Sequence, residues 1–318
     1  MARYALQRLG AGVLVLAVMS VLVFLATHAL PSNTAQLILG QYSTPETQAA
    51  LEHKLGLDLP LPVQYWHWAR GVLHGDLGQS LVMERPVGPL LWDALARSAV
   101  LSLAAMAVVS TLGPALGVLA AVKQGRWPDH AATVFTYLGI SVPEFYWGLV
   151  LILVFGSTFH LLPTSGAADL SDGFGPFLAH LVLPVVTLTL TLLAHVSRLT
   201  RSSMIEALDS AYVKVARARG LPERVVIVRH ALRNALLPTI TVLAHDFGFL
   251  IGGIVAVEAI FAYPGIGRLL IFSLERQDLP LMQAAILVLT AVYCLANLGA
   301  DLLYGVANPR IRFGGGVE

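Results

Sequence analysis

Ionisable side chains within long apolar stretches are the strongest candidates for chemistry in this chain. A charged group is expensive in hydrocarbon, so such residues are retained mainly for a function or for pairing with another polar group. Three such carboxylates are Glu144, Asp246 and Glu258, and those of Glu144 and Asp246 can accept a peptide's amino terminus or a hydrated metal cation. We predict that Glu144 and Asp246 line a path for a charged solute and that Glu258 serves an outer gate. For Glu144 and Asp246, a hydrogen bond to a neighbouring helix or partner subunit is an equally weighted alternative.

The sequence lacks the motifs of several other kinds of site. The lysines Lys54, Lys123 and Lys214 do not stand in the Gly-Lys-Ser or Gly-Lys-Thr context of a phosphate-binding loop, and no His-Glu-x-x-His zinc motif occurs. The single cysteine, Cys294, excludes an internal disulfide and a cysteine-based metal site. We therefore predict no catalytic residue, no metal ligand and no cofactor on this chain, which argues against an intramembrane enzyme. The net charge of +1 gives no indication of a nucleic-acid partner.

The composition indicates that the elements positioning these residues are membrane helices. Hydrophobic residues make up 56% of the chain and charged residues 12%, against roughly 25% charged residues in soluble domains. A transmembrane helix needs about 20 mostly apolar residues. Six stretches meet this requirement and predict an all-α membrane protein with six spans, at residues 9–30, 98–122, 131–155, 177–196, 239–261 and 281–306.

Lysine and arginine residues are distributed unequally between alternate loops. With both termini in the cytoplasm, fourteen lie inside and six outside, which agrees with the preference of basic loops for the cytoplasmic side. In the extracytoplasmic segment, Thr44-Pro45-Glu46 predicts a helix start and Gly56 its end. Trp66 and Trp68 suit either an interfacial belt or packing on the bundle. We predict one transmembrane domain over residues 1–318, divided into an uncleaved N-terminal helix 1–30, the extracytoplasmic segment 31–97, a core bundle 98–306 with an inner loop 198–238, and a cytoplasmic tail 307–318.

The inner loop between the fourth and fifth predicted spans is strongly basic. Tyr212, Ala216 and Arg219 share one helical face by their spacing. Gly220 can adopt the left-handed conformation that ends a helix, and Pro222 can begin the next one. The pattern predicts two short helices separated by a sharp turn, with Leu221 at a projecting tip. Such a loop is suited to docking in a groove of a soluble partner, whereas a merely solvated basic loop is the alternative.

This loop and several other motifs resemble the permease subunits of ABC importers, in the dipeptide, oligopeptide and nickel branch. The loop resembles that branch in Ala-Arg-Ala-Arg-Gly-Leu at 216–221 and in Arg-His-Ala-Leu-Arg-Asn-Ala-Leu-Leu-Pro at 229–238. Further matches are Gly-Asp-Leu-Gly at 75–78, Ser-Val-Pro at 141–143 and Pro-Gly-Ile-Gly-Arg at 264–268. The chain departs from the general family loop at Lys214, Val215, His230 and Arg233, and from common branch motifs at residues 31–33 and at Asn308.

The resemblance implies a permease that works by alternating access in the bacterial inner membrane. It implies a homologous second permease, two ATP-binding subunits that hold ATP and Mg, and an extracytoplasmic solute-binding protein. Short peptides are the expected substrate, and nickel or a metal chelate is the alternative; a structural scaffold would not need a loop for docking an ATPase. The residues that the resemblance places in coupling to the ATPases are Tyr212, Ala216, Arg217, Arg219, Gly220, Leu221, Arg229, His230 and Asn234.

Overall fold

A computed structural model describes residues 2–29, 44, 46–47 and 58–307. Throughout these residues the regular structure is helical, so the predicted all-α class is confirmed. Five helices are long: α1 (Ala2–Ala29), α5 (Val87–Val122), α8 (Phe174–Asp209), α11 (Leu232–Ile260) and α13 (Leu279–Ala307). The shorter helices are α4 (Leu61–Leu73), α6 (Trp127–Ser141), α7 (Glu144–Leu151), α9 (Ala211–Ala218), α10 (Glu223–Val225) and α12 (Ile266–Glu275).

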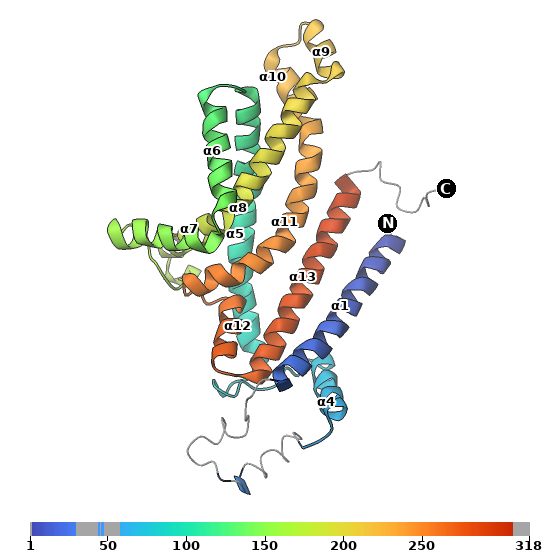
Figure 1. The fold of residues 1–318 in the computed structure, drawn as a ribbon, viewed down its shortest axis with the longest axis vertical. Coiled ribbons are helices and arrows are strands. Elements are labelled where there is room, and N and C mark those ends of the chain that lie inside the picture. Colours follow the sequence, from blue (N-terminus) through green and yellow to red (C-terminus); the bar gives the residue numbers. More distant parts are fainter. Residues whose placement is uncertain (1, 30–43, 45, 48–57, 308–318) are drawn as a thin grey trace.

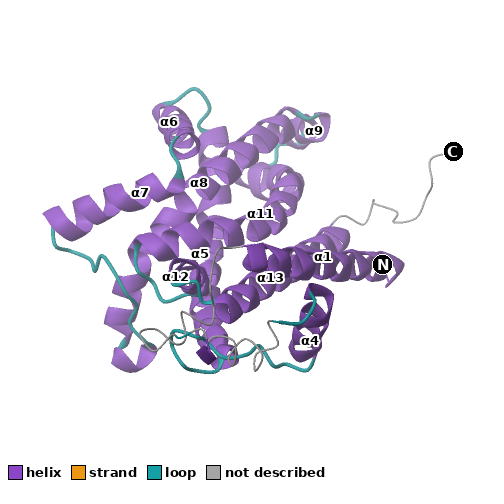
Figure 2. Cartoon of the chain, turned by 60° about the horizontal axis from the view of Figure 1, so that its bottom comes forward, coloured by secondary structure: helices purple, strands orange, loops and turns teal. Residues whose placement is uncertain are grey.

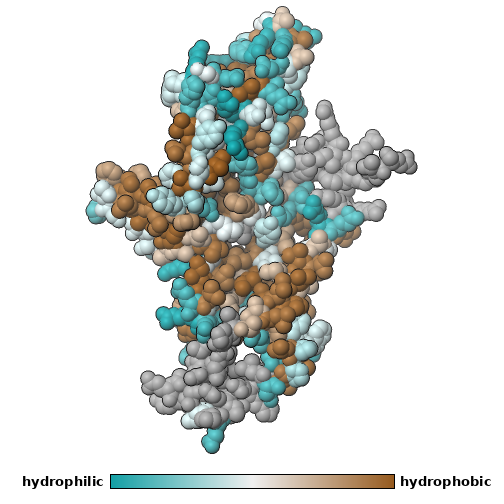
Figure 3. Space-filling view, viewed as in Figure 1, coloured by the Kyte–Doolittle hydropathy of each residue, from teal (hydrophilic) through white to brown (hydrophobic). Residues whose placement is uncertain are grey.

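The helices run alternately between two ends of the molecule. One end carries α9, α10 and the turn between α5 and α6, and the first residues of α1 and the last of α13 point the same way (Figure 1). The opposite end carries α4 and α12. Hydrophilic side chains gather around α9 and α10, whereas apolar side chains cover α7 and much of the lower half of the bundle (Figure 3). This arrangement agrees with the alternating loops predicted from the sequence.

The predicted third span is not a continuous helix. Five described helices are long and apolar enough to cross a membrane alone, and a sixth span is reached only by counting α6 and the helix that follows it together, across a bend of 106°. Val142 at the bend has φ −109° and ψ 127°, because a residue before proline is pushed out of the helical region and Pro143 has no N–H to donate. Beyond α7 the chain continues as the π-helix η2 (Ile152–Thr158), and this arm projects from the bundle (Figure 2).

The two longest helices pack closely because glycine stands at their contact. A Cβ atom on Gly117 would lie 2.6 Å from the carbonyl oxygen of Ser197, and one on Gly113 would lie 2.8 Å from Val196. Around this contact, Leu101, Val109 and Leu188 form part of the main buried core of α5, α8 and α11. α5 and α8 both extend well beyond the predicted spans, so their ends reach past the apolar core to the loops.

An ion pair joins α6 to α8 near the end that carries α9. Arg201 donates from Nε and Nη2 to the two carboxylate oxygens of Asp129, at 2.5 and 2.9 Å. The Asp129 carboxylate also accepts the backbone N–H of Gly125 at 2.9 Å. This two-pronged contact fixes where α6 lies on α8.

At the opposite end, aromatic contacts hold part of the segment between α1 and α5 against the bundle. Tyr65 and Trp68 of α4 pack around Phe24 of α1, with ring centroids 5.4 and 5.8 Å away, whereas Trp66 is 65% exposed. Of the two tryptophans left open by the sequence, Trp68 therefore packs on the bundle. Thr44 Oγ1 accepts the backbone N–H of Thr47 at 3.2 Å, as expected of a helix N-cap. The rest of that predicted helix, and nearly all of the predicted tail 307–318, lie outside the described residues.

Candidate coupling loop and membrane cavity

The turn after α9 has the geometry predicted for Gly220. Its φ is +76°, its N–H donates to the carbonyl of Arg217 at 2.9 Å, and the N–H of Leu221 donates to the carbonyl of Ala216 at 3.4 Å. These two bonds form the Schellman ending of a helix, which favours glycine because a residue with a Cβ is strained at positive φ. Pro222 follows at φ −62° and ψ 141°, so the chain reverses within a few residues.

The second half of the predicted loop differs from expectation. α10 does not end after one turn; it continues through the π-helix η4 (Val226–Ala231) into α11. The reason is that Val226 and Ala231 are fully buried against α8 and α9, so the apolar pattern carries the helix onward into the bundle. The prediction of two short helices is therefore correct for α9 and wrong for its successor. The loop is one short helix folded back against the start of a long one.

The loop encloses a shallow hollow of about 420 Å³. Five of the nine residues that the resemblance assigns to coupling line it: Tyr212, Ala216, Arg219, Leu221 and His230. Of its lining residues, Ala216 is buried, whereas Tyr212 and Val215 are 42% and 51% exposed. The hollow thus combines exposed apolar surface with basic side chains, a composition suited to a soluble protein partner.

The other four predicted coupling residues have different surroundings. Gly220 makes the turn itself. Arg217 points to Glu223, with Nη2 to Oε1 at 2.6 Å and Nε to Oε2 at 3.2 Å, and this hydrogen bonding raises the pKa of Arg217 above its ordinary value. The ion pair between Arg217 and Glu223 therefore connects the two sides of the turn and stabilises it. Arg229 and Asn234 are exposed on η4 and α11 and do not line the hollow.

Two polar contacts connect the helices on either side of the loop. Thr200 of α8 and Thr239 of α11 share a buried hydrogen bond of 3.0 Å. Asp246 of α11, which is 5% exposed, places Oδ2 3.5 Å from Nδ1 of His195 of α8. Asp246 does not line the membrane cavity described below, so its surroundings match the alternative interpretation of pairing with a neighbouring helix. α8 and α11 are thereby linked at two positions along their length.

Glu258 lies fully buried near the opposite end of α11. Its Oε1 accepts Ser98 Oγ–H at 2.5 Å, and its Oε2 accepts the N–H groups of Gly267 and Arg268 at 2.7 and 3.3 Å. The carboxylate therefore caps the N-terminus of α12, where the helix dipole favours negative charge. A Cβ atom on Gly265 would overlap this carboxylate at 2.0 Å. Glu258 thus has a structural role, which is to cap α12. In the sequence this role is indicated by the Pro-Gly-Ile-Gly-Arg motif, whose residues surround the carboxylate.

A second buried carboxylate was not singled out from the sequence. Asp278, just before α13, accepts Ser80 Oγ–H at 2.5 Å and the N–H groups of Leu81 and Val82 at 3.2 and 3.3 Å. It ties the segment that precedes α5 to the start of α13, across 198 positions of sequence. The Gly-Asp-Leu-Gly motif at 75–78, followed by Ser80, marked one partner of this contact but not the other.

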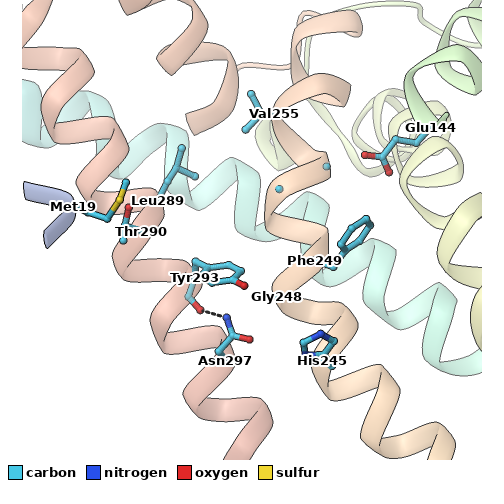
Figure 4. Close-up of a pocket in the computed structure, with 12 residues that line it drawn as sticks. Met19, Glu144, His245, Gly248, Phe249, Val255, Leu289, Thr290, Tyr293 and Asn297 are labelled. Carbon is cyan, nitrogen blue, oxygen red and sulfur yellow. Dashed lines mark hydrogen bonds between the residues drawn. The ribbon is translucent and has the colours of Figure 1, made fainter. Parts of the chain in front are cut away.

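Glu144 lies at the edge of a cavity of about 700 Å³ between membrane helices. Glycines of α11 form part of its wall, and α1, α7 and α13 supply the remaining sides (Figure 4). On the α13 side, Asn297 Nδ2 donates to the carbonyl of Tyr293 at 2.9 Å. The cavity is lined by Met19, Glu144, His245, Gly248, Phe249, Gly252, Gly253, Val255, Leu289, Thr290, Tyr293 and Asn297.

Two family profiles match this chain, and together they cover most of the helices and the loop. The profile described as "Binding-protein-dependent transport system inner membrane component" matches residues 113–313, and the corresponding N-terminal profile matches residues 1–102. The chain belongs to this family. It is therefore a multi-pass membrane component of a binding-protein-dependent transport system, and the prediction of an importer permease is confirmed.

Individual relatives of this permease align over nearly its whole length. The glutathione transport system permease protein GsiC of Salmonella typhimurium (strain LT2) is 38% identical over 313 residues, which are 98% of this chain and 100% of the relative. The probable peptide ABC transporter permease protein y4tP of Sinorhizobium fredii is 38% identical over 310 residues, 98% of this chain and 99% of the relative. A solved chain of an amino acid ABC transporter with histidines is 17% identical, with a TM-score of 0.49 over 70% of this chain and 94% of that chain.

Proposed function

We propose that this permease forms half of the translocation path of an ATP-driven importer of short peptides. A homologous second permease, two ATP-binding subunits carrying ATP and Mg, and an extracytoplasmic solute-binding protein complete the assembly. The observation that carries the coupling is the Gly220 turn, which holds an exposed basic and apolar hollow at the junction of α8 and α11. The choice of peptides is supported by the names of relatives that align end to end with this chain.

In this mechanism the loop transmits the closure of the ATPases to the membrane helices. A ligand or partner shifts a conformational equilibrium only through contacts that differ between the two states. The hollow provides such a contact, because the ATPases can approach it differently when they close on ATP. The Thr200–Thr239 and His195–Asp246 contacts join α8 to α11, so a displacement of the loop moves both helices together. The path between the two permeases then opens to the outside and receives the substrate.

A strain that lacks this chain is expected to lose uptake of short peptides, while uptake of sugars and phosphate continues. Uptake of radiolabelled di- and tripeptides, compared with nickel and a nickel chelate, measures this in a strain without parallel importers. Loss of nickel uptake alone would move the assignment to the alternative substrate of the same family. Normal uptake of both classes would refute both substrates.

The orientation of the chain is tested separately. In a Cys294→Ala background, cysteines at Gln79 and Ser171, two exposed positions at the α12 end, are expected to react with a membrane-impermeant maleimide added to intact cells. A cysteine at the exposed Ala218 of α9 is expected to react only after the inner membrane is permeabilised. Labelling of Ala218→Cys in intact cells would place the loop outside and contradict the coupling mechanism.

A further inference from the structure

Glu144 is a membrane carboxylate whose role the fold leaves open. It is half-buried and sits in the first turn of α7, directly after the bend at Pro143. Within the described residues its carboxylate has no hydrogen bond and no ion pair, in contrast to the buried carboxylates of Asp129, Glu258 and Asp278. An uncompensated carboxylate at this depth is unfavourable unless something binds it. The cavity that it borders is the place from which a cation can do so.

The cavity lies midway along the membrane helices. Its lining comes from Met19 and from residues 289–297, near the centres of α1 and α13, and from residues 245–255 in the second half of α11. A volume of about 700 Å³ falls within the range of roughly 300 to 1,000 Å³ typical of small-molecule sites. The position and size therefore suit a solute that is crossing the membrane.

The polar groups of the cavity are arranged along its length. Glu144 points toward α11 from one edge, whereas Tyr293 and Asn297 of α13 lie at the other edge (Figure 4). Between them runs the glycine surface of α11, which is open at Gly252, where an added Cβ atom would meet no atom within 4 Å. At the far edge Asn297 uses its amide N–H on the Tyr293 carbonyl, and its side chain covers Gly248. Glu144 is thus the sole acidic group in the described lining, at one edge of the cavity.

We propose that Glu144 binds the amino-terminal ammonium group of the peptide while the peptide backbone lies over the glycine surface of α11. This inference rests on the proposed peptide function and assigns its recognition to one residue. A charge-assisted hydrogen bond between ammonium and carboxylate is stronger than a neutral one, and the glycines let an extended backbone approach α11 closely. Tyr293, Asn297 and His245 provide further hydrogen-bonding groups for the remainder of the peptide.

The position of the Glu144 carboxylate depends on Gly253. A Cβ atom on Gly253 would lie 2.3 Å from Glu144 Oε1 and 2.9 Å from Cδ, whereas a Cβ atom on Gly299 would meet no atom within 4 Å. Both glycines lie inside long helices, Gly253 in α11 and Gly299 in α13, and Gly299 does not line the cavity. Replacing either by alanine changes the helix propensity of its helix equally. Only the change at Gly253 displaces the carboxylate, so the two positions form a matched pair.

The test uses the complete complex, with the second permease, both ATPases and the binding protein, reconstituted in vesicles with radiolabelled alanyl-alanine. Glu144→Gln and Gly253→Ala are expected to lower the initial rate of uptake by about tenfold or more, the factor that about 1.4 kcal/mol of lost binding gives. Glu144→Asp and Gly299→Ala are expected to stay within about threefold of wild type, less than 1 kcal/mol. In every variant the ATP hydrolysis stimulated by the loaded binding protein should persist, since the coupling loop is untouched.

The outcomes separate this inference from the function on which it rests. Wild-type uptake by Glu144→Gln, or equal losses in Gly253→Ala and Gly299→Ala, would overturn the role of Glu144 and leave the peptide importer standing. A parallel loss of stimulated ATP hydrolysis in Glu144→Gln would make its effect structural and would also overturn it. If the wild-type complex does not take up alanyl-alanine, the peptide assignment itself fails, and the amino-group site fails with it.

Discussion

Gly220→Pro is expected to abolish the stimulation of ATP hydrolysis by substrate-loaded binding protein, with the chain still inserted in the membrane. Gly220 has φ +76°, whereas proline is locked near about −65°. The substitution also removes the N–H that donates to the carbonyl of Arg217. The turn must then reorganise, and Leu221 and the hollow beside it are displaced from the ATPases. The measurement is ATPase activity of the purified complex, with and without loaded binding protein.

Two matched controls make this experiment specific to the loop. Gly125 has φ +72° and, like Gly220, no atom within 4 Å of an added Cβ, but it lies in the turn between α5 and α6. Gly220→Ala should weaken stimulation, since a left-handed alanine costs roughly 1 kcal/mol, whereas Gly125→Ala should not. Likewise Arg219→Glu, at the hollow, should uncouple the complex, whereas Lys214→Glu, outside the hollow, should not. Full stimulation in both Gly220→Pro and Arg219→Glu would remove this loop from the mechanism.

Glu258→Ala is expected to destabilise the end of the bundle that carries α12. The change strands the N–H groups of Gly267 and Arg268 and the hydroxyl of Ser98, which all donate to this carboxylate. At about 1 to 3 kcal/mol for each buried group left unsatisfied, the loss amounts to about 3 kcal/mol or more. Thermal unfolding of the purified complex in detergent should then begin at least about 5 °C lower. Glu258→Gln, which keeps one accepting oxygen, should fall between this variant and wild type.

An exposed glutamate of the same helix serves as the control for that measurement. Glu275 is exposed at the last position of α12, so Glu275→Ala removes the same charge without stranding a buried donor. The Glu275→Ala complex should unfold at the same temperature as the wild-type complex. Equal unfolding temperatures for Glu258→Ala and Glu275→Ala would show that the carboxylate does not cap α12 in the folded protein.

Local patterns in the sequence were sufficient for part of the structure. Apolar runs of adequate length located the membrane helices, and Gly220 followed by Pro222 located the loop turn, because both depend on residues close together in the chain. The signal for the bend also lies in two adjacent residues, Val142 and Pro143. The apolar residues on either side nevertheless predict one uninterrupted span. There the constraint on the residue before proline overrides the continuity of hydrophobicity.

The roles of the acidic residues depended on partners that are remote in sequence. Glu258 meets Ser98 across 160 positions, and Asp278 meets Ser80 across 198. Burial alone could not distinguish these capping carboxylates from Glu144, because all of them stand near apolar segments. Only the arrangement of the helices shows which ones have donors within the chain and which one faces a cavity.

The sharp bend at Pro143 also bears on how the chain enters the membrane during synthesis. α6 has 15 residues and covers about 22 Å, less than the roughly 30 Å of the hydrocarbon core. α6 is therefore too short to span the bilayer on its own during synthesis. Its main neighbour, α8, is synthesised later and supplies Arg201 for Asp129. We thus expect α6 and α7 to reach their final positions only after α8 has been inserted. The ion pair between Arg201 and Asp129 then holds α6 in a position that its apolar length alone does not secure.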